Sequence, residues 1–286
     1  TTSGRLSSSG KMNMQQIPRD NPIVKGCMRA AKGNKIVAMD LTTAEVYVAA
    51  VLAKDENLMD VFRQGGNFHS TIAKLVFNLP CEAEDVAEHY STQRQAAKAV
   101  TFGIMYGAGA NKISQQVTAD SGKNFSKGDA QEVIDDYFRQ FHKLKKWIDH
   151  SSKYIMDNGF IYSQYGRKRR LPNVRSDNQG IQSHEVRSGL NFLVQSVASD
   201  INLLGAIDTH NHIKSINKTK EMRIFALVHD SILAEVDEGY VDEYMEIVQK
   251  CIQKDRGIYI PGCPVGCDFD VGDDYSFGKF EKMYDI

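Results

Sequence analysis

Four side chains of complementary chemistry recur at four-residue steps in the segment RQAAKAVTFGIMYG: Arg94, Lys98, Phe102 and Tyr106. In an α-helix, residues four apart lie nearly above one another, so two cations and two aromatic rings form one stripe. The helical rise separates Arg94 from Phe102 by about 12 Å, close to the reach of a triphosphate joined to a sugar. Cations suit phosphates and rings suit a sugar and base, which predicts a nucleotide-binding helix over about 94–107. An amphipathic surface helix with ordinary core aromatics is an equally open interpretation of this segment alone.

Two carboxylates stand at the ends of apolar runs that are far apart in the sequence. NKIVAMDL has the pattern of a buried strand with Asp40 at its exit. RIFALVHDSILAEV holds two apolar runs around Asp230 and favours a β-hairpin with a polar tip, with one buried helix as the alternative. If these strands are neighbours, Asp40 and Asp230 meet and can hold two divalent cations through oxygen. Two such ions, about 3.5–4 Å apart, support phosphoryl transfer.

The elements that must hold these residues follow from periodicity and breaker residues. A helix is expected over 42–53, and residues 55–193 are mostly helical by pattern. Glycine and proline mark breaks in that region at 65–66, 79–80, 107–109, 158–159 and 171–172. A further helix is expected to run through Ile207, and the turn-rich end PVGCDFDVGDDYSFGKF to supply a last strand.

Composition bounds the class of protein. The chain has 286 residues, 42% of them hydrophobic, which allows one large or two modest domains with a real core. The formal net charge is -1, so a polyanion must be held by local basic clusters such as GRKRR at 166–170 or the three lysines of 143–146. Five irregularly spaced cysteines indicate a reducing compartment. The sequence shows neither a signal peptide nor an uninterrupted apolar stretch that predicts a membrane span.

Taken together, these segments make the chain similar to the polymerase region of family A DNA polymerases, the group of bacterial DNA polymerase I and several phage replicases. MDLTTAE resembles the first catalytic motif, RQAAKAVTFGIMYG the nucleotide-binding finger helix and LVHDS the third motif. NFHST, YGRKRRLPN and RSGLNFLVQSVASD are further matches, and the resemblance runs from TTSGRLSSS to the C-terminus. Three motifs in the family's order, together with these three further matching segments, form a pattern that is specific for the family.

The resemblance implies an α+β fold of the right-hand polymerase type. A palm with an antiparallel sheet and flanking helices would comprise residues 1–54 and 194–286, and mostly helical fingers would comprise 55–193. A thumb and any exonuclease would lie N-terminal of Thr1, in the same or a separate chain. Palm and fingers alone are expected to grip duplex DNA poorly and to be weakly active or inactive. The expected location is the cytoplasm of a bacterium or of a phage-infected host.

The resemblance also implies site residues. Asp40 and Asp230, with the carbonyl of Leu41, would bind two Mg²⁺ ions, for which Mn²⁺ can substitute. The residues that would bind the incoming dNTP are Arg94, Lys98, Phe102, Tyr106, His69 and Glu45. Lys98 would also act as the acid toward the leaving pyrophosphate. Glu45 would close the space of a ribose 2′-hydroxyl, and Phe102, which has no hydroxyl, implies discrimination against dideoxynucleotides.

The resemblance further implies that polar residues elsewhere contact primer–template DNA. These are Arg5, Asn13, Gln15, Arg187, Asn191, Gln195 and His229, and the GRKRR loop would hold backbone phosphate. No membrane partner is expected. The sequence departs from the family pattern at Leu41, Thr43, Tyr47 and Ser231, where an aromatic residue, a Gln, an Arg and an acid are usual.

Three other functions are compatible with parts of the pattern. A single-subunit phage-type RNA polymerase shares the spacing of the finger helix and an HDS motif, but Glu45 and Phe102 argue against it. A catalytically silent DNA-binding replication remnant is disfavoured by the intact Asp40, Asp230, Arg94 and Lys98. A small-nucleotide hydrolase would need a phosphate-cradling Gly-Lys-Ser/Thr loop, which the sequence lacks.

Overall fold

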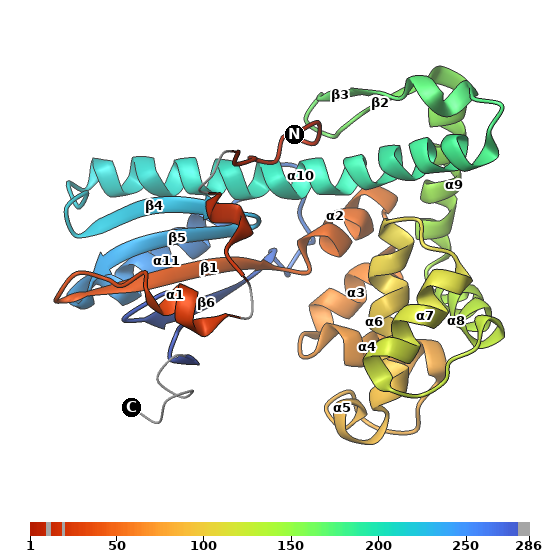
Figure 1. Cartoon of the computed structure of the whole chain (residues 1–286), viewed down its shortest axis with the longest axis horizontal. Helices are drawn as coiled ribbons and strands as arrows, with labels where there is room; N and C mark the ends of the chain where they lie inside the picture. Colours follow the sequence, from red (N-terminus) through yellow and green to blue (C-terminus); the bar gives the residue numbers. More distant parts are fainter. Residues whose placement is uncertain (10–12, 19–20, 280–286) are drawn as a thin grey trace. The chain divides into compact units, whose positions relative to one another are not determined.

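The chain folds into two compact units. The computed structural model describes residues 1–9, 13–18 and 21–279 (Figure 1). The first unit comprises Thr1–Ala44, Ala198–Gly257 and Pro264–Ile286, and the second unit comprises Glu45–Val197 and Ile258–Cys263. The borders expected from sequence lie at 54/55 and 193/194, and the assignment of these segments to palm and fingers stays a prediction.

The first unit is built on a four-stranded antiparallel sheet of order β4-β5-β1-β6 (Figure 1). The strands are β1 (Asn34–Thr42), β4 (Met222–Val228), β5 (Ser231–Asp237) and β6 (Gly266–Gly272). Four consecutive residues of β1, Ile36 to Met39, are buried, as expected for a central strand covered on both faces. The predicted hairpin and last strand are confirmed, and the alternative of one buried helix is wrong.

Helices cover this sheet. Helix α11 (Val241–Ile252) packs against β1, β5 and β6, and its Tyr244 and Val248 are fully buried. Gly205 of helix α10 (Gln179–Ser215) lies so close to α11 that a Cβ there would come within 2.3 Å of the Ile252 side chain. The remaining short helices of the unit are η1 (Met14–Gln16), α1 (Pro22–Gly26) and η3 (Glu238–Tyr240).

The second unit is mostly helical, as predicted. Its helices are α2 (Ala44–Ala53), α3 (Glu56–Gln64), α4 (Phe68–Phe77), α5 (Val86–His89), α6 (Ser91–Met105), α7 (Ala110–Ser121), α8 (Lys127–Gln140), α9 (His142–Asn158) and η2 (Pro172–Arg175). Gly65 and Gly159, both with positive φ, end α3 and α9 at two of the predicted breaks. A hairpin of β2 (Phe160–Tyr162) and β3 (Lys168–Arg170) interrupts the helices and was not predicted.

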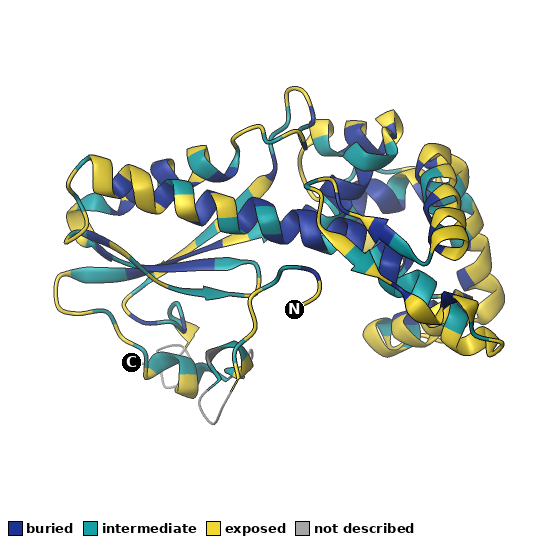
Figure 2. Ribbon diagram, turned by 90° about the horizontal axis from the view of Figure 1, so that it is seen from above, coloured by how far each residue is buried: buried dark blue, intermediate teal, exposed yellow. Residues whose placement is uncertain are grey.

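Helix α10 (Gln179–Ser215) extends beyond the predicted end at Ile207 and contributes residues to both units. By length and composition it could cross a membrane, although polar residues such as Ser196 and Ser199 interrupt its apolar run. Of the apolar window, 67% is buried inside the protein, as is typical of a core helix (Figure 2).

Candidate active site

Asp40 and Asp230 come together at one end of the sheet. Asp40 on β1 pairs with Ser231, the first residue of β5. Asp230 directly precedes Ser231 in the two-residue turn between β4 and β5. His229, the other residue of the turn, has a φ of 54°, in the left-handed region that non-glycine residues seldom adopt. The register of the predicted hairpin therefore brings the two carboxylates to neighbouring positions.

Both carboxylates line one hollow of about 530 Å³ in the first unit, called here the carboxylate hollow. It brings together six of the residues predicted from sequence, namely Arg5, Gln15, Asp40, Leu41, His229 and Asp230. Lys25, Ser231 and Tyr275 line the same hollow but were not predicted as site residues. Lys25 and Tyr275 form a cation–π pair, with the ammonium 4.8 Å from the ring centroid.

Each carboxylate accepts a hydrogen bond within the carboxylate hollow. Arg5 Nη2 donates to both oxygens of Asp230, at 2.7 and 2.6 Å. The Ser231 hydroxyl donates to Asp40 Oδ1. At the position where the family resemblance leads one to expect an acidic residue, Ser231 thus donates a hydrogen bond to the Asp40 carboxylate. The Arg5 guanidinium therefore compensates the negative charge of Asp230, and the neutral Ser231 hydroxyl donates a hydrogen bond to Asp40.

The donor chemistry of this site fits a hard divalent cation. Carboxylate and carbonyl oxygens are the ligands that Mg²⁺ prefers, and this ion is usually held by one or two carboxylates together with substrate phosphates. Within residues 1–9, 13–18 and 21–279, no three His, Cys, Asp or Glu side chains cluster as a metal cage. Asp40 and Asp230 therefore fit an ion that binds together with a phosphate-bearing substrate.

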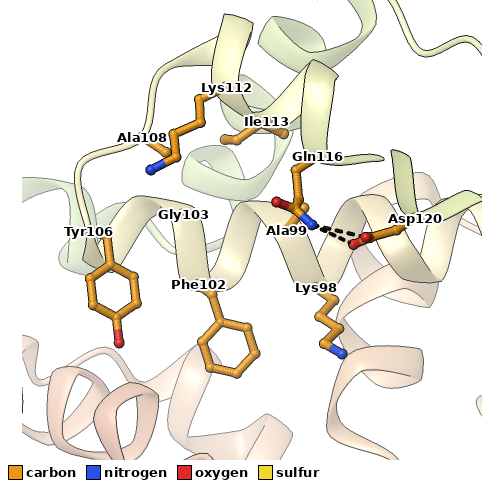
Figure 3. A pocket seen from close by; sticks show the side chains of 10 residues that line it. All are labelled: Lys98, Ala99, Phe102, Gly103, Tyr106, Ala108, Lys112, Ile113, Gln116 and Asp120. Carbon is orange, nitrogen blue, oxygen red and sulfur yellow. Dashed lines mark hydrogen bonds between the residues drawn. The ribbon is translucent and has the colours of Figure 1, made fainter. Parts of the chain in front are cut away.

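The predicted cation–aromatic stripe lies on α6 in the second unit. Figure 3 shows Lys98, Phe102 and Tyr106 projecting from the same side of this helix. The helix begins at Ser91 and ends at Met105, so Tyr106 is its C-cap residue rather than part of the helix. Gly107, with a φ of 65°, turns the chain away after it.

The cationic end of the stripe is held by the start of α4. Arg94 donates from Nε to the Ser70 hydroxyl at 3.2 Å and from Nη2 to Asn67 Oδ1 at 3.3 Å. Asn67 is the N-cap of α4, because the same oxygen accepts a hydrogen bond from the backbone of Ser70. The guanidinium is therefore fixed at a helix N-terminus, a position that favours anions.

His69 lies beside these cations. Its ring centroid is 5.3 Å from that of Phe102, and its Nδ1 is buried without a hydrogen-bond partner among the described residues. Burial, and then the positive charges of Lys98 and Arg94, lower the pKa of His69 to about 4. The structure thus gathers a neutral imidazole and two cations, which together can bind an anion.

A pocket of about 250 Å³ opens between α6 and α7 (Figure 3). Its α6 side is formed by Lys98, Ala99, Phe102 and Gly103, together with the C-cap residue Tyr106. Its α7 side includes Lys112, Gln116 and Asp120, which were not predicted as site residues although they repeat the four-residue spacing of the stripe. Gln116 donates to both oxygens of Asp120 at 2.9 Å. The aromatic half of the stripe therefore borders a cavity with polar groups on its far wall.

Glu45 in the first turn of α2 lies beside the same stripe. Its carboxylate accepts a hydrogen bond from the Tyr106 hydroxyl. Arg187 of α10 packs at the other side of this turn, because a Cβ on Gly107 would come within 2.3 Å of its side chain. Glu45 and Arg187, distant in the sequence, are therefore both positioned at the end of α6.

The other predicted DNA-contacting residues have varied surroundings. Asn191 and Gln195 follow Arg187 at four-residue steps on α10, and Asn191 Oδ1 is buried without a partner among the described residues. Asn13 accepts a hydrogen bond from the backbone of Gln15 and so caps η1. In the basic loop, Arg167 and Arg169 donate to serines of α10, namely Ser196 and Ser188. Contacts of all these residues with DNA stay predictions.

Two departures from the family pattern have a structural role. Tyr47 is buried, its hydroxyl donating to the Cys263 carbonyl and accepting from the Ile260 amide, both at 2.8 Å. It thereby ties segment Ile258–Cys263 into the second unit. Thr43 has a φ of 49°, which explains why α2 begins at Ala44 and not at the predicted Thr42.

Comparison with known proteins identifies the family. The model of DNA polymerase family A matches residues 1–276. The DNA polymerase of Escherichia phage T5 is 50% identical over 99% of this chain and 36% of its own length. The thermostable DNA polymerase I of Thermus aquaticus is 28% identical over 98% of this chain and 32% of its own length. The chain thus spans about a third of the curated relatives it matches.

A solved structure shares the fold. The POL domain of Pol1 from M. smegmatis, in complex with DNA primer–template and dNTP, superposes with a TM-score of 0.83 at 25% identity. The match covers 97% of this chain and 47% of that one. The predicted α+β class, with an antiparallel sheet and flanking helices, is confirmed. On the family match, the chain is a member of DNA polymerase family A.

Proposed function

We propose that this chain catalyses template-directed DNA synthesis, as the catalytic part of a family A DNA polymerase. It adds deoxynucleoside monophosphates from dNTPs to the 3′-hydroxyl of a primer by two-metal-ion phosphoryl transfer. The observation that carries the proposal is that Asp40 and Asp230 line one hollow. The names of the relatives and the primer–template and dNTP bound to the M. smegmatis domain support it.

The carboxylate hollow serves the metal ions in this proposal. Asp40 and Asp230, with the carbonyl of Leu41, hold two Mg²⁺ ions, which Mn²⁺ can replace. When bound, such ions lower the pKa of the attacking hydroxyl and neutralise the phosphates. The side chains of Asp40 and Asp230 line the hollow, and Ser231 orients Asp40 through its hydrogen bond.

The stripe serves the incoming dNTP. Arg94 and His69 bind phosphate oxygens, and Lys98 binds them and donates a proton to the leaving pyrophosphate. Because His69 is neutral at pH 7, it contributes an N–H donor rather than a charge. Phe102 packs on the sugar and base, Tyr106 stacks near the templating position, and Glu45 fills the space of a ribose 2′-hydroxyl.

The duplex is held by the polar residues predicted from the sequence. They are Arg5, Asn13, Gln15, Arg187, Asn191, Gln195 and His229. Contacts to minor-groove acceptors, which every correct base pair presents alike, would detect pairing without reading sequence. The basic loop at 166–170 adds phosphate contacts, so affinity for primer–template is expected to fall with salt.

Primer extension tests this function. The 286-residue chain is incubated with primer–template, dNTPs and Mg²⁺ at low ionic strength, and product length is followed. Wild type is expected to extend the primer weakly, because palm and fingers alone grip duplex DNA poorly, and Asp40→Ala and Asp230→Ala are each expected to lower that rate by about 1,000-fold or more. Asp270→Ala is the matched control, because Asp270 is an exposed carboxylate on β6 of the same sheet. Unreduced extension by Asp40→Ala or Asp230→Ala, or a preference for NTPs over dNTPs, would contradict the proposal.

A further inference from the structure

A second hollow of about 380 Å³ lies in the second unit, between α9, β2 and α10. We call it the aromatic hollow. Its main lining residues are Trp147, His150, Tyr154, Ile161, Tyr162 and Leu193. The residues that line it have no role in the reaction proposed above. Its volume falls in the range of about 300–1,000 Å³ typical of ligand pockets. The aromatic hollow is therefore large enough for a planar ligand the size of a nucleobase.

Aromatic rings give this hollow rigid walls. Trp147 and Tyr154 lie two helical turns apart on one face of α9. Phe160 packs edge-on against both Tyr154 and Tyr162, with centroid distances of 6.1 and 5.6 Å. Tyr154 is 37% exposed and Tyr162 is 49% exposed, although both are large apolar rings. Exposed rings whose orientation is fixed by a third ring suit stacking against a planar ligand.

Cations border these rings. In the β2–β3 hairpin, Lys168 pairs with Tyr162 and Arg170 with Phe160, so two rings and two cations share one face of the ribbon. The Lys168 ammonium lies 3.9 Å from the Phe160 centroid and 5.3 Å from that of Tyr162. The alternate pair, with Ile161, faces the core. The exposed face of the hairpin is therefore both aromatic and positively charged.

Helix α9 adds further positive charge. Lys143 and Lys146 are exposed and stand four residues before Trp147 and His150, so each lies one turn from a residue that lines the hollow. Asp149 of the same helix is neutralised by Lys145, at 2.5 Å. Since the whole chain has a net charge of -1, this concentration of cations is local. It favours a polyanion.

We propose that the aromatic hollow binds an unpaired base of single-stranded DNA, with the bordering cations holding the adjacent phosphates. Stacking rings beside a positively charged surface are the combination by which proteins bind single strands without reading sequence. A peptide without acidic side chains would leave these cations without anionic groups to pair with. The inference rests on the proposed DNA-polymerase function, which supplies the DNA strand, but it assigns a separate site.

The fluorescence of Trp147 tests the site directly, because it is the one tryptophan of the sequence. A short oligodeoxythymidylate is titrated into the 286-residue chain. We expect saturable quenching, with an affinity that falls as salt is raised. An abasic oligomer of the same length carries the phosphates without the bases. It is expected to leave the fluorescence nearly unchanged.

Three variants locate the binding. Tyr162→Ala is expected to weaken oligonucleotide affinity about tenfold or more, the usual effect of losing one stacking ring. Lys168→Gln should reduce the salt dependence by about the contribution of one phosphate contact. Met156→Ala is the matched control, because Met156 is 44% exposed on α9 but does not line the hollow. Its affinity should equal that of wild type. Thermal unfolding checks that each variant is folded.

Three results would overturn the inference: no quenching by the oligonucleotide, equal quenching by the abasic oligomer, or wild-type affinity in folded Tyr162→Ala. Primer extension by the wild-type chain, measured in parallel, separates this failure from that of the proposed function. Extension without quenching overturns the aromatic hollow alone. Saturable quenching without extension supports the hollow, because base stacking does not depend on the catalytic activity, which is expected to be weak or absent in this chain alone.

Discussion

The hydroxyl of Tyr106 donates a hydrogen bond of 2.5 Å to Oε2 of Glu45, a residue 61 positions earlier in the chain. The contact joins the first turn of α2 to the end of α6, where the aromatic half of the stripe borders a pocket. Both side chains are thereby held in fixed positions, as a residue that excludes a substrate group must be. The pair supports the role proposed for Glu45 against a ribose 2′-hydroxyl.

Glu45→Ala is expected to relax the choice between deoxyribose and ribose. The substitution removes the carboxylate and leaves space beside Tyr106, so incorporation of NTPs relative to dNTPs should rise about tenfold or more. Single-nucleotide extension with each substrate measures the ratio. Glu88→Ala, which removes an exposed carboxylate from α5, is the control. An unchanged ratio in Glu45→Ala would show that another residue excludes the 2′-hydroxyl.

Phe102→Tyr is expected to relax discrimination against dideoxynucleotides. A phenylalanine ring cannot replace the hydrogen bond of a missing 3′-hydroxyl, whereas a tyrosine hydroxyl can, which is worth about 1.4 kcal/mol or about tenfold in selectivity. Phe102 borders the α6–α7 pocket and is half-buried, so the added oxygen can reach a ligand. Competition between dideoxynucleotides and dNTPs in primer extension measures the effect. Phe138→Tyr on α8 provides the same chemical change away from the pocket, and selectivity unchanged in both variants would refute the placement.

His69 predicts a pH dependence of stability. Its pKa is lowered to about 4 in the folded chain, so between pH 6.5 and about 4 the unfolded state binds a proton that the folded state does not. The free energy of unfolding should therefore fall as pH drops through this window, by up to about 3 kcal/mol, and show no contribution from His69 above pH 6.5. Urea unfolding of wild type and His69→Gln at several pH values isolates the contribution of His69 to the free energy of unfolding, because the other titrating groups are common to both. His184→Gln, which changes an exposed histidine, should behave as wild type. Parallel pH profiles for wild type and His69→Gln would contradict the prediction.

The parts of this fold with strong local signals could be predicted from sequence. The apolar run of β1 and the two runs around Asp230 predicted strands, and their antiparallel pairing alone brings Asp40 and Asp230 together. The four-residue spacing of the stripe predicted α6, because helical neighbours are set by local geometry. Local spacing alone therefore predicts that Arg94 and Lys98 lie on one helix.

Other features depend on contacts that no local pattern encodes. The β2–β3 hairpin has strands of three residues, too short for an alternating pattern to show. The ion pair of Arg5 with Asp230 joins positions 225 residues apart, and the segment around Arg5 has no regular periodicity. Helix α10 is buried around much of its circumference, and its buried positions include the polar Ser196 and Ser199. No single apolar face therefore marks the full length of the helix in the sequence. Tertiary packing, and not local propensity, decides these cases.

Gly107→Ala is expected to destabilise the turn that ends the stripe. Gly107 has a φ of 65°, which alanine adopts at a cost, and a Cβ there would come within 2.3 Å of the Arg187 side chain. We expect the free energy of unfolding to fall by about 1–3 kcal/mol, and Arg187 to be displaced, so that primer–template affinity falls as well. Gly109→Ala is the matched control two residues later, because Gly109 has a φ of -87° and open space where its Cβ would stand. Urea unfolding should show a change of less than about 1 kcal/mol for the control. Equal effects of the two substitutions on stability and on DNA affinity would mean that neither the left-handed turn nor its contact with Arg187 holds the end of α6 in place.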